Sequence, residues 1–218
     1  MNIWTLWLDA LRSLVDALST EAGLGLGLAI IVATLLLRTL LLPISWSAAH
    51  RGIIRQKKMA KLQPELQQLK EKYANDPNSY MQKMTELYRE HDLSLVDGKS
   101  LLGSLAQMPL LLGMFQALRS VGDGARFLWV PNLLKPDLLL ALIAGVTTAL
   151  MISVNPDLPE QFRLALILVP SIIAIVAALK VCSALSLYWV ASNCFSAAQT
   201  VALHFVVGRR LRAGTLKI

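Results

Sequence analysis

The sequence predicts an all-α membrane protein with five transmembrane helices, an interfacial helix at the N-terminus and a helical hairpin in the cytoplasm. Two observations predict this fold. The 218 residues are 55% hydrophobic and only 16% charged, whereas a soluble domain carries about 25% charged residues. Five long stretches also contain no Asp, Glu, Lys or Arg, except for one arginine inside the first. Such stretches are typical of membrane spans, which need roughly 20 apolar residues.

The N-terminal segment 1–20 is expected to form an amphipathic helix that lies in the membrane interface. Apolar residues recur at helical spacing from Ile3 to Leu18, and Asp9 and Arg12 lie on the opposite face. Two tryptophans near its start would anchor it among the lipid headgroups. The alternative is a solvated leader that folds onto the spans.

The membrane spans are expected at the apolar stretches that follow. They are assigned to residues 22–50, 100–118, 138–155, 163–179 and 181–207, and a basic tail, 208–218, follows the last span. The fourth span is short and contains Pro170. A locally thinned bilayer or neighbouring protein would have to accommodate it.

The polar segment 51–92 is expected to form the cytoplasmic hairpin. Two helical patterns, 51–74 and 79–90, flank a turn that contains Pro77, and Pro64 should weaken or kink the first helix. A basic cluster near the start of the hairpin is assigned to lipid headgroups, with plain solvation as the alternative, rather than to nucleic acid. It consists of Arg51, Arg55, Lys57, Lys58 and Lys61.

Lysine and arginine are distributed unequally between the two sides of the predicted spans. If the N-terminus lies outside, 15 of them fall in the inner segments and 5 in the outer ones. Basic residues favour the cytoplasmic side of a membrane. The sequence therefore predicts a multi-pass protein with its N-terminus outside and its C-terminus in the cytoplasm.

Arg38 is the charged residue that interrupts the first apolar stretch. Placing a charge in a span costs about 2.5–3.5 kcal/mol on insertion scales, and such residues usually face a bundle interior or a water-filled cavity. We expect a hydrated cavity; a side chain that reaches the headgroups is the alternative. None of the five stretches holds a carboxylate, so other polar groups must solvate the guanidinium. The candidates for this site are Thr34, Ser104, Gln107, Thr147, Thr148, Trp189, Ser192, Ser196 and Gln199.

The spans offer little for catalysis. They contain no carboxylate, no metal-ligand spacing, no nucleophile beside a base and no phosphate-binding loop. Cys182 and Cys194 lie in an apolar stretch and are expected to pack as small hydrophobic residues. We therefore expect a protein that is not an enzyme and that uses neither a cofactor nor a metal.

Four segments of the sequence resemble the YidC-type membrane-protein insertases in order and spacing. They are LLLRTLLLPISWSAAHRGIIRQKKMAKLQPELQQLKEKY, SLAQMPLLLGMFQALR, FLWVPNLLKPD and LSLYWVASNCFSAAQ. The resemblance covers about residues 22–205. It implies a five-span core around a hydrophilic groove, which is open to the cytoplasm and to lipid but closed to the outside. It also implies a short form without the large periplasmic domain, a place in the bacterial inner membrane, and Arg38 as the groove arginine.

The function that follows is the insertion of client helices and short polar tails from the cytoplasm into the bilayer through this groove. The expected partners are newly made membrane proteins and membrane lipids, with the ribosome and the Sec translocon as further candidates and no specific nucleic acid. Two alternatives stay open. Prolines that the family usually has before the second and fifth spans are missing, which would fit an assembly or scaffold paralogue dedicated to one membrane system. A small-solute channel would need a polar path through both leaflets, whereas the outer halves of the spans are almost purely apolar.

Overall fold

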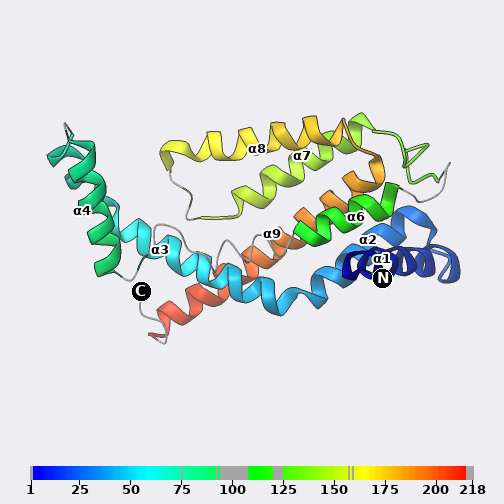
Figure 1. Cartoon of the computed structure of the whole chain (residues 1–218), viewed down its shortest axis with the longest axis horizontal. Helices are drawn as coiled ribbons and strands as arrows, with labels where there is room; N and C mark the ends of the chain where they lie inside the picture. Colours follow the sequence, from blue (N-terminus) through cyan, green and yellow to red (C-terminus); the bar gives the residue numbers. More distant parts are fainter. Residues whose placement is uncertain are drawn as a thin grey trace. The chain divides into compact units, whose positions relative to one another are not determined.

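The part of the chain that the structure describes is α-helical (Figure 1). A computed structural model describes residues 2–74, 76–91, 93, 108–119, 125–156, 158 and 160–214. These residues form eight α-helices and no β-strand, apart from an isolated bridge between Phe127 and Val130. The all-helical class predicted from the sequence is therefore confirmed.

Two compact units make up the chain, and each is described by itself. The first unit comprises Met1–Pro43 and Ala106–Ala202, and the second comprises Ile44–Leu105 and Leu203–Ile218. The helices, in chain order, are α1 (Ile3–Asp16), α2 (Gly25–Leu40), α3 (Leu42–Lys72), α4 (Pro77–Glu90), α6 (Met108–Arg119), α7 (Leu138–Ser153), α8 (Arg163–Ala178) and α9 (Ser183–Arg212). A π-helical turn, Ala17–Glu21, extends α1, and a 3₁₀ turn, Glu160–Phe162, precedes α8.

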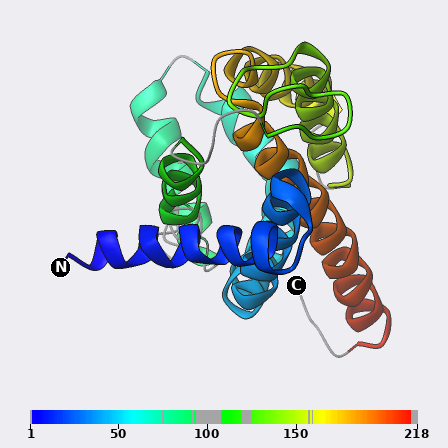
Figure 2. The ribbon, with the colours of Figure 1, turned by 90° about the vertical axis from the view of Figure 1, so that its right-hand side faces the viewer.

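In the first unit, α1 packs against α6 and α2 (Figure 2). Its buried face contains Leu8, Leu11 and Val15. The contact with α6 is close, because a Cβ atom on Gly113 would lie 2.6 Å from the indole nitrogen of Trp7. The apolar face of α1 thus contacts other helices, as in the alternative in which the N-terminal segment folds onto the spans. Its position in a membrane interface stays a prediction.

One non-helical residue, Leu41, separates α2 from α3, so the segment 22–50 is not one continuous helix. Pro43 accounts for the break, because it has no N–H to donate to the carbonyl oxygen of Thr39 and its ring would clash with that carbonyl. Proline is tolerated in the first turn of the helix that follows. Arg38 consequently lies in the last turn of α2 and not deep inside a long helix.

Hydrogen bonds join the segment between α6 and α7 to the N-terminal end of α9. The Ala184 N–H donates to the carbonyl oxygen of Leu133 at 2.9 Å. Ser183 donates to the carbonyl oxygen of Lys135 through its N–H at 3.1 Å and through its hydroxyl at 2.6 Å. Since Ser183 is fully buried, these bonds satisfy backbone groups at a helix start that water does not reach.

The same segment also contacts α2. The Phe127 ring lies against Gly27, where a Cβ atom would overlap the ring. Glycine at this position therefore permits the close approach of the loop to the helix.

α7 and α8 lie side by side as an antiparallel pair in both views (Figures 1 and 2). Asp137 caps α7, because its carboxylate accepts the N–H of Leu140 at 2.8 Å. The two helices meet at Gly145, whose missing side chain leaves room for Ile175. Much of the rest of α8, from Leu164 to Val176, exposes large aliphatic side chains, which suits an apolar surrounding better than water.

In the second unit, α3 makes two separate apolar contacts. Ile53 of α3 is buried with Leu203 and Val207 of α9. Further along α3, Leu62 is buried with Tyr88 of α4. These clusters are small, so each holds only a short length of helix.

The α3–α4 turn is stabilised by Asp76, whose carboxylate accepts the N–H groups of Asn78 and Ser79 at 3.2 Å and the Ser79 hydroxyl at 2.6 Å. α3 continues through Pro64 without a break, and the expected weakening or kink at this residue stays a prediction. Pro64 and Ala60 are both exposed. Water can therefore bind the Ala60 carbonyl that loses its helical partner.

Among the described residues, one helix is long and apolar enough to cross a membrane by itself: α9. α2 and the start of α3 would provide a second if the two are counted together. α7 and α8 are apolar but have 16 residues each, which corresponds to roughly 24 Å. Much of the expected span 100–118 lies outside the described residues, so a count of five spans stays a prediction.

Candidate functional site

Arg38 is held inside the first unit by a side chain that is distant in sequence. Only 8% of the residue is exposed. Its Nε–H donates a hydrogen bond of 3.2 Å to the hydroxyl oxygen of Ser192 on α9, which is itself buried. Among the described residues, no carboxylate lies within ion-pair distance of the guanidinium. The serine hydroxyl therefore replaces part of the hydration that the cation would have in water, as hydroxyls in the spans were expected to do.

Tyr188 lies against both members of this pair, one helical turn before Ser192. Its hydroxyl oxygen is buried, beside the guanidinium and the Ser192 hydroxyl. Tyr188 thus adds a second hydrogen-bonding group beside the cation.

A cavity of about 410 Å³ opens beside these three residues. Its walls combine apolar and aromatic side chains with a few polar groups, which is the usual composition of a binding pocket. The lining residues are Arg38, Leu112, Phe115, Leu185, Tyr188, Trp189, Ser192 and Asn193. They come from α2, α6 and α9, all within the first unit.

Asn193 connects the cavity to α7. Its amide nitrogen donates to the hydroxyl oxygen of Thr148 at 2.8 Å and approaches that of Thr147 at 3.4 Å. Both threonine hydroxyls also donate to the carbonyl oxygen of Ala144 in their own helix. The threonines are thus used within α7 and towards Asn193, and no described bond links them to the guanidinium.

The structure brings together only some of the residues selected from the sequence. Ser192 and Trp189 line the cavity with Arg38. Thr34 is fully buried, but its hydroxyl donates to the Ile30 carbonyl oxygen at 2.6 Å, within its own helix. Other candidates are not among the cavity residues or cannot be placed. Ser196 and Gln199 are half-buried further along α9, and Ser104 and Gln107 lie outside the described residues.

Sequence reasoning missed Tyr188 and Asn193. A usable signal was present, because both belong to the segment LSLYWVASNCFSAAQ, and Tyr188 lies four residues before Ser192 on the same helical face. The predicted stripe along the fifth span consists of Trp189, Ser192, Ser196 and Gln199, spaced 3, 4 and 3 residues apart, and this spacing leaves Tyr188 and Asn193 out.

The basic cluster of the sequence lies on α3, in the part of that helix that belongs to the second unit. Its members are Arg51, Arg55, Lys57, Lys58 and Lys61, and they are exposed or half-buried. Contact with lipid headgroups therefore remains a prediction for them.

The residues around Arg38 provide a buried cation and hydrogen-bonding groups, which can bind a polar partner. In the described part of the chain, no group of three or more His, Cys, Asp or Glu side chains could hold a metal ion. A buried guanidinium beside an open cavity favours an anionic group, above all a carboxylate, which it can bind through two N–H groups at once. Together, the fold and the site define an all-helical protein with a membrane-length helix and a cavity between helices that is lined by a buried arginine.

Comparison with known proteins identifies the family. Residues 18–208 match the family model described as 60Kd inner membrane protein. The chain is 38% identical to "Membrane protein insertase YidC 1" of Halalkalibacterium halodurans, with 86% of this chain and 72% of the relative covered. It is 34% identical to "Membrane protein insertase MisCA" of Bacillus subtilis, with 87% and 74% covered. It is also 32% identical to "Membrane protein insertase YidC" of Fusobacterium nucleatum, with 90% and 94% covered. The chain belongs to this family of inner membrane proteins, as the resemblance of its sequence segments predicted.

Proposed function

We propose that this protein is a membrane-protein insertase that passes client helices and short polar tails from the cytoplasm into the bilayer. Membership of the family and the names of the relatives, which are membrane protein insertases, support this function. The observation that carries the mechanism is the burial of Arg38 beside a cavity, with no described carboxylate to neutralise it.

The first step assigned to the site is the capture of a polar segment. A guanidinium carries five N–H donors, and one of them is used for Ser192. A client carboxylate can accept two of the others. This pair forms where water is scarce, so its attraction is stronger than at a protein surface. Arg38 would thereby lower the free energy of an acidic client segment partway across the membrane.

The second step is the release of the client into lipid. An apolar client helix that leaves water gains about 25 cal/mol for each Å² of apolar surface removed from it. The apolar and aromatic side chains around Arg38, such as Phe115 and Leu185, suit temporary contact with such a helix. No nucleotide enters this scheme, and every step proceeds by binding.

The proposed topology has five spans, the N-terminus outside and the C-terminus in the cytoplasm of a bacterial inner membrane. The excess of basic residues in the segments assigned to the cytoplasm supports it. In this arrangement α3 and α4 form the cytoplasmic hairpin, and the cavity belongs to a hydrophilic groove open to the cytoplasm. The basic cluster on α3 contacts anionic headgroups, and the ribosome and the Sec translocon are candidate partners.

Insertion into vesicles that contain the purified protein tests the proposal. The client has one apolar helix and a short tail, prepared once with acidic residues and once with the matching amides. Arg38→Ala is expected to slow insertion of the acidic form at least tenfold and to leave the amide form nearly unchanged. Arg38→Lys, which retains the charge, should recover part of the rate.

A control variant distinguishes loss of the cation from loss of the fold. Arg163→Ala removes a half-buried arginine that pairs with Glu160, and it should insert both clients at the unaltered rate. Insertion of the acidic client at the unaltered rate by folded Arg38→Ala would exclude the proposed role of Arg38. Failure of the unaltered protein to insert either client would exclude the function itself.

A further inference from the structure

The loop before α7 exposes two large apolar side chains next to each other. Leu128 is 74% exposed and Trp129 is 46% exposed. Side chains of this size are usually covered in a folded protein, and a cluster of exposed ones marks a contact surface. Leu138 and Leu139 at the start of α7 are exposed as well, so the apolar surface continues from the loop onto the helix.

Hydrogen bonds hold this loop in one shape. Phe127 and Val130 exchange backbone bonds of 3.0 and 2.8 Å across the turn. The indole N–H of Trp129 donates to the carboxylate of Asp137 at 3.1 Å. These bonds hold Leu128 and Trp129, which form the tip of the loop, in a defined position.

The backbone at Leu128 is strained. Its φ angle is +51°, in the left-handed region that a branched side chain rarely adopts. Asparagine or glycine would be the ordinary choice at such a position. Because the Leu128 side chain is exposed, packing inside the protein does not explain a leucine at this strained position. A contact with something outside the protein does explain it.

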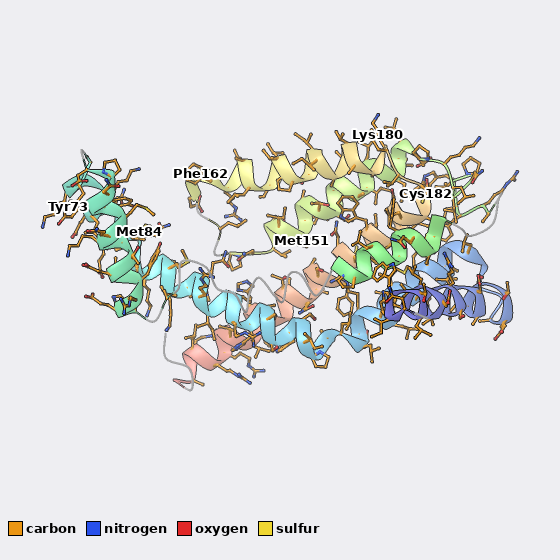
Figure 3. All side chains as sticks on the ribbon, in the orientation of Figure 1. Tyr73, Met84, Met151, Phe162, Lys180 and Cys182 are labelled. Carbon is orange, nitrogen blue, oxygen red and sulfur yellow. The ribbon has the colours of Figure 1, made fainter. Side chains whose placement is uncertain are left out.

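The charges around the tip are basic. Three basic residues are exposed: Arg126, Lys135 and Lys180. Lys180 lies just after the C-terminal end of α8 (Figure 3). Asp137 is the acidic residue of the described loop, and its carboxylate is occupied by Trp129 and by the N-terminal end of α7. Apolar side chains with a tryptophan, surrounded by lysine and arginine, have the composition of a segment at a membrane surface.

We propose that this loop is a membrane anchor, in which Leu128 and Trp129 enter the boundary between lipid headgroups and acyl chains while the three basic residues face lipid phosphates. The anchor acts on the Arg38 site through the backbone. Lys135 is bonded to Ser183, and Ser183 precedes Ser192 by roughly 14 Å along α9. The loop therefore sets the depth at which the Arg38–Ser192 pair lies in the membrane.

A spin label at residue 128 tests the location of the tip. The label is attached to Leu128→Cys in a chain carrying Cys182→Ser and Cys194→Ser, reconstituted in vesicles of phosphatidylethanolamine and phosphatidylglycerol. Oxygen, which concentrates in lipid, and a water-soluble nickel complex are compared as relaxing agents. Labels at Ile173 on α8 and Glu71 on α3, both exposed, give the apolar and aqueous reference values.

We expect the ratio of relaxation by oxygen to relaxation by the nickel complex at residue 128 to lie between the values measured at Ile173 and Glu71. A ratio equal to that of the Glu71 label would overturn the proposal, because the tip would then lie in water. Protection from both agents would also overturn it, since a protein surface would then cover the tip. Neither result concerns insertion of clients, so the proposed function is tested separately.

Two substitutions at Leu128 distinguish an anchor from a structural loop. Leu128→Asn suits the positive φ angle but removes the apolar side chain, and Leu128→Met keeps an apolar side chain under the same strain. Quenching by brominated lipid, taken as the difference between each chain and its Trp129→Phe form, reports the depth of Trp129. We expect at least twofold weaker quenching in Leu128→Asn and unaltered quenching in Leu128→Met. Equal quenching in both variants would contradict the anchor.

Discussion

The Nε–H of Arg38 donates a 3.2 Å hydrogen bond to the hydroxyl oxygen of Ser192, and this bond joins two residues that are 154 positions apart. It links the last turn of α2 to the N-terminal third of α9, and both residues are buried. Because the cation is fixed by a neutral hydroxyl and not by a carboxylate, its charge remains available to an anion from elsewhere. The bond therefore positions the guanidinium without neutralising it.

The energy of this contact can be measured with a double-mutant cycle of Arg38→Met and Ser192→Ala. A hydrogen bond to a charged group contributes about 1.5–3 kcal/mol, and we expect a coupling free energy of at least about 1 kcal/mol between the two substitutions. The measurement is the free energy of unfolding in mixed micelles. Additive effects of the two substitutions would show that the contact contributes nothing to stability.

A carboxylate introduced next to Arg38 should imitate a bound client. Asn193 lines the same cavity, so Asn193→Asp is expected to pair with the guanidinium and to reduce insertion of the acidic-tailed client several-fold. The client with the amide tail should be far less affected. The readout is the ratio of the two insertion rates in vesicles.

Asn193→Ala is the control for this experiment, because it also removes the bond to Thr148. Hydrogen bonds between membrane helices contribute about 0.6 kcal/mol on average and about 1.7 at most, so this variant should remain folded. It should slow both clients equally or not at all. If Asn193→Asp and Asn193→Ala behave alike, the introduced charge does not reach Arg38.

The contact between α7 and α8 depends on the absence of a side chain at Gly145. A methyl group there would overlap Ile175 and lie 3.2 Å from the carbonyl oxygen of Ser171. Gly145→Ala is therefore expected to destabilise the protein by about 1–3 kcal/mol, the usual cost of overpacking. Thermal unfolding in detergent, followed by circular dichroism, measures it.

Two further variants test whether overlap with Ile175 causes the loss of stability in Gly145→Ala. In a chain that already carries Ile175→Ala, Gly145→Ala should have little further effect, because the overlapping atoms are gone. Gly52→Ala on α3, where a Cβ atom would meet nothing, should be neutral or slightly stabilising. An equally large loss of stability in the Ile175→Ala background would show that the collision with Ile175 is not the reason.

Protonation of Asp76 should loosen the start of α4. Its hydrogen bonds from the Ser79 hydroxyl and the Ser79 and Asn78 N–H groups hold the pKa of the Asp76 carboxyl below its usual range. A lowered pKa in the folded state means that the charged form stabilises the helix start. This contribution is complete above the ordinary aspartate pKa of about 3.9 and is lost as the pH falls through the lower, folded value.

Hydrogen exchange of α4 peptides, corrected for intrinsic rates, should detect this change at the acid end of the range. The amides of the first α4 turn are expected to lose protection relative to the rest of the helix. Asp76→Asn, which retains a capping oxygen but does not titrate, should abolish the pH dependence. Persistence of the same pH dependence in Asp76→Asn would assign it to another group.

Several features followed from the sequence alone. The uncharged stretches predicted helices, because a long apolar segment can satisfy its backbone in lipid only by forming one. Arg38 stands out in the sequence because it is a charge inside such a stretch. The four segments that resemble YidC-type insertases also predicted the family, which the match over residues 18–208 confirms.

The partners of Arg38 were decided by tertiary structure. Thr34 has the right helical spacing, but a buried threonine can donate to the carbonyl one turn earlier in its own helix, and it does so. Ser192, Tyr188 and Asn193 meet the cavity because α9 packs beside α2 and α6, a contact that no local spacing encodes. Local periodicity thus determined which segments are helical, whereas the packing of helices far apart in sequence determined which polar groups surround the cation.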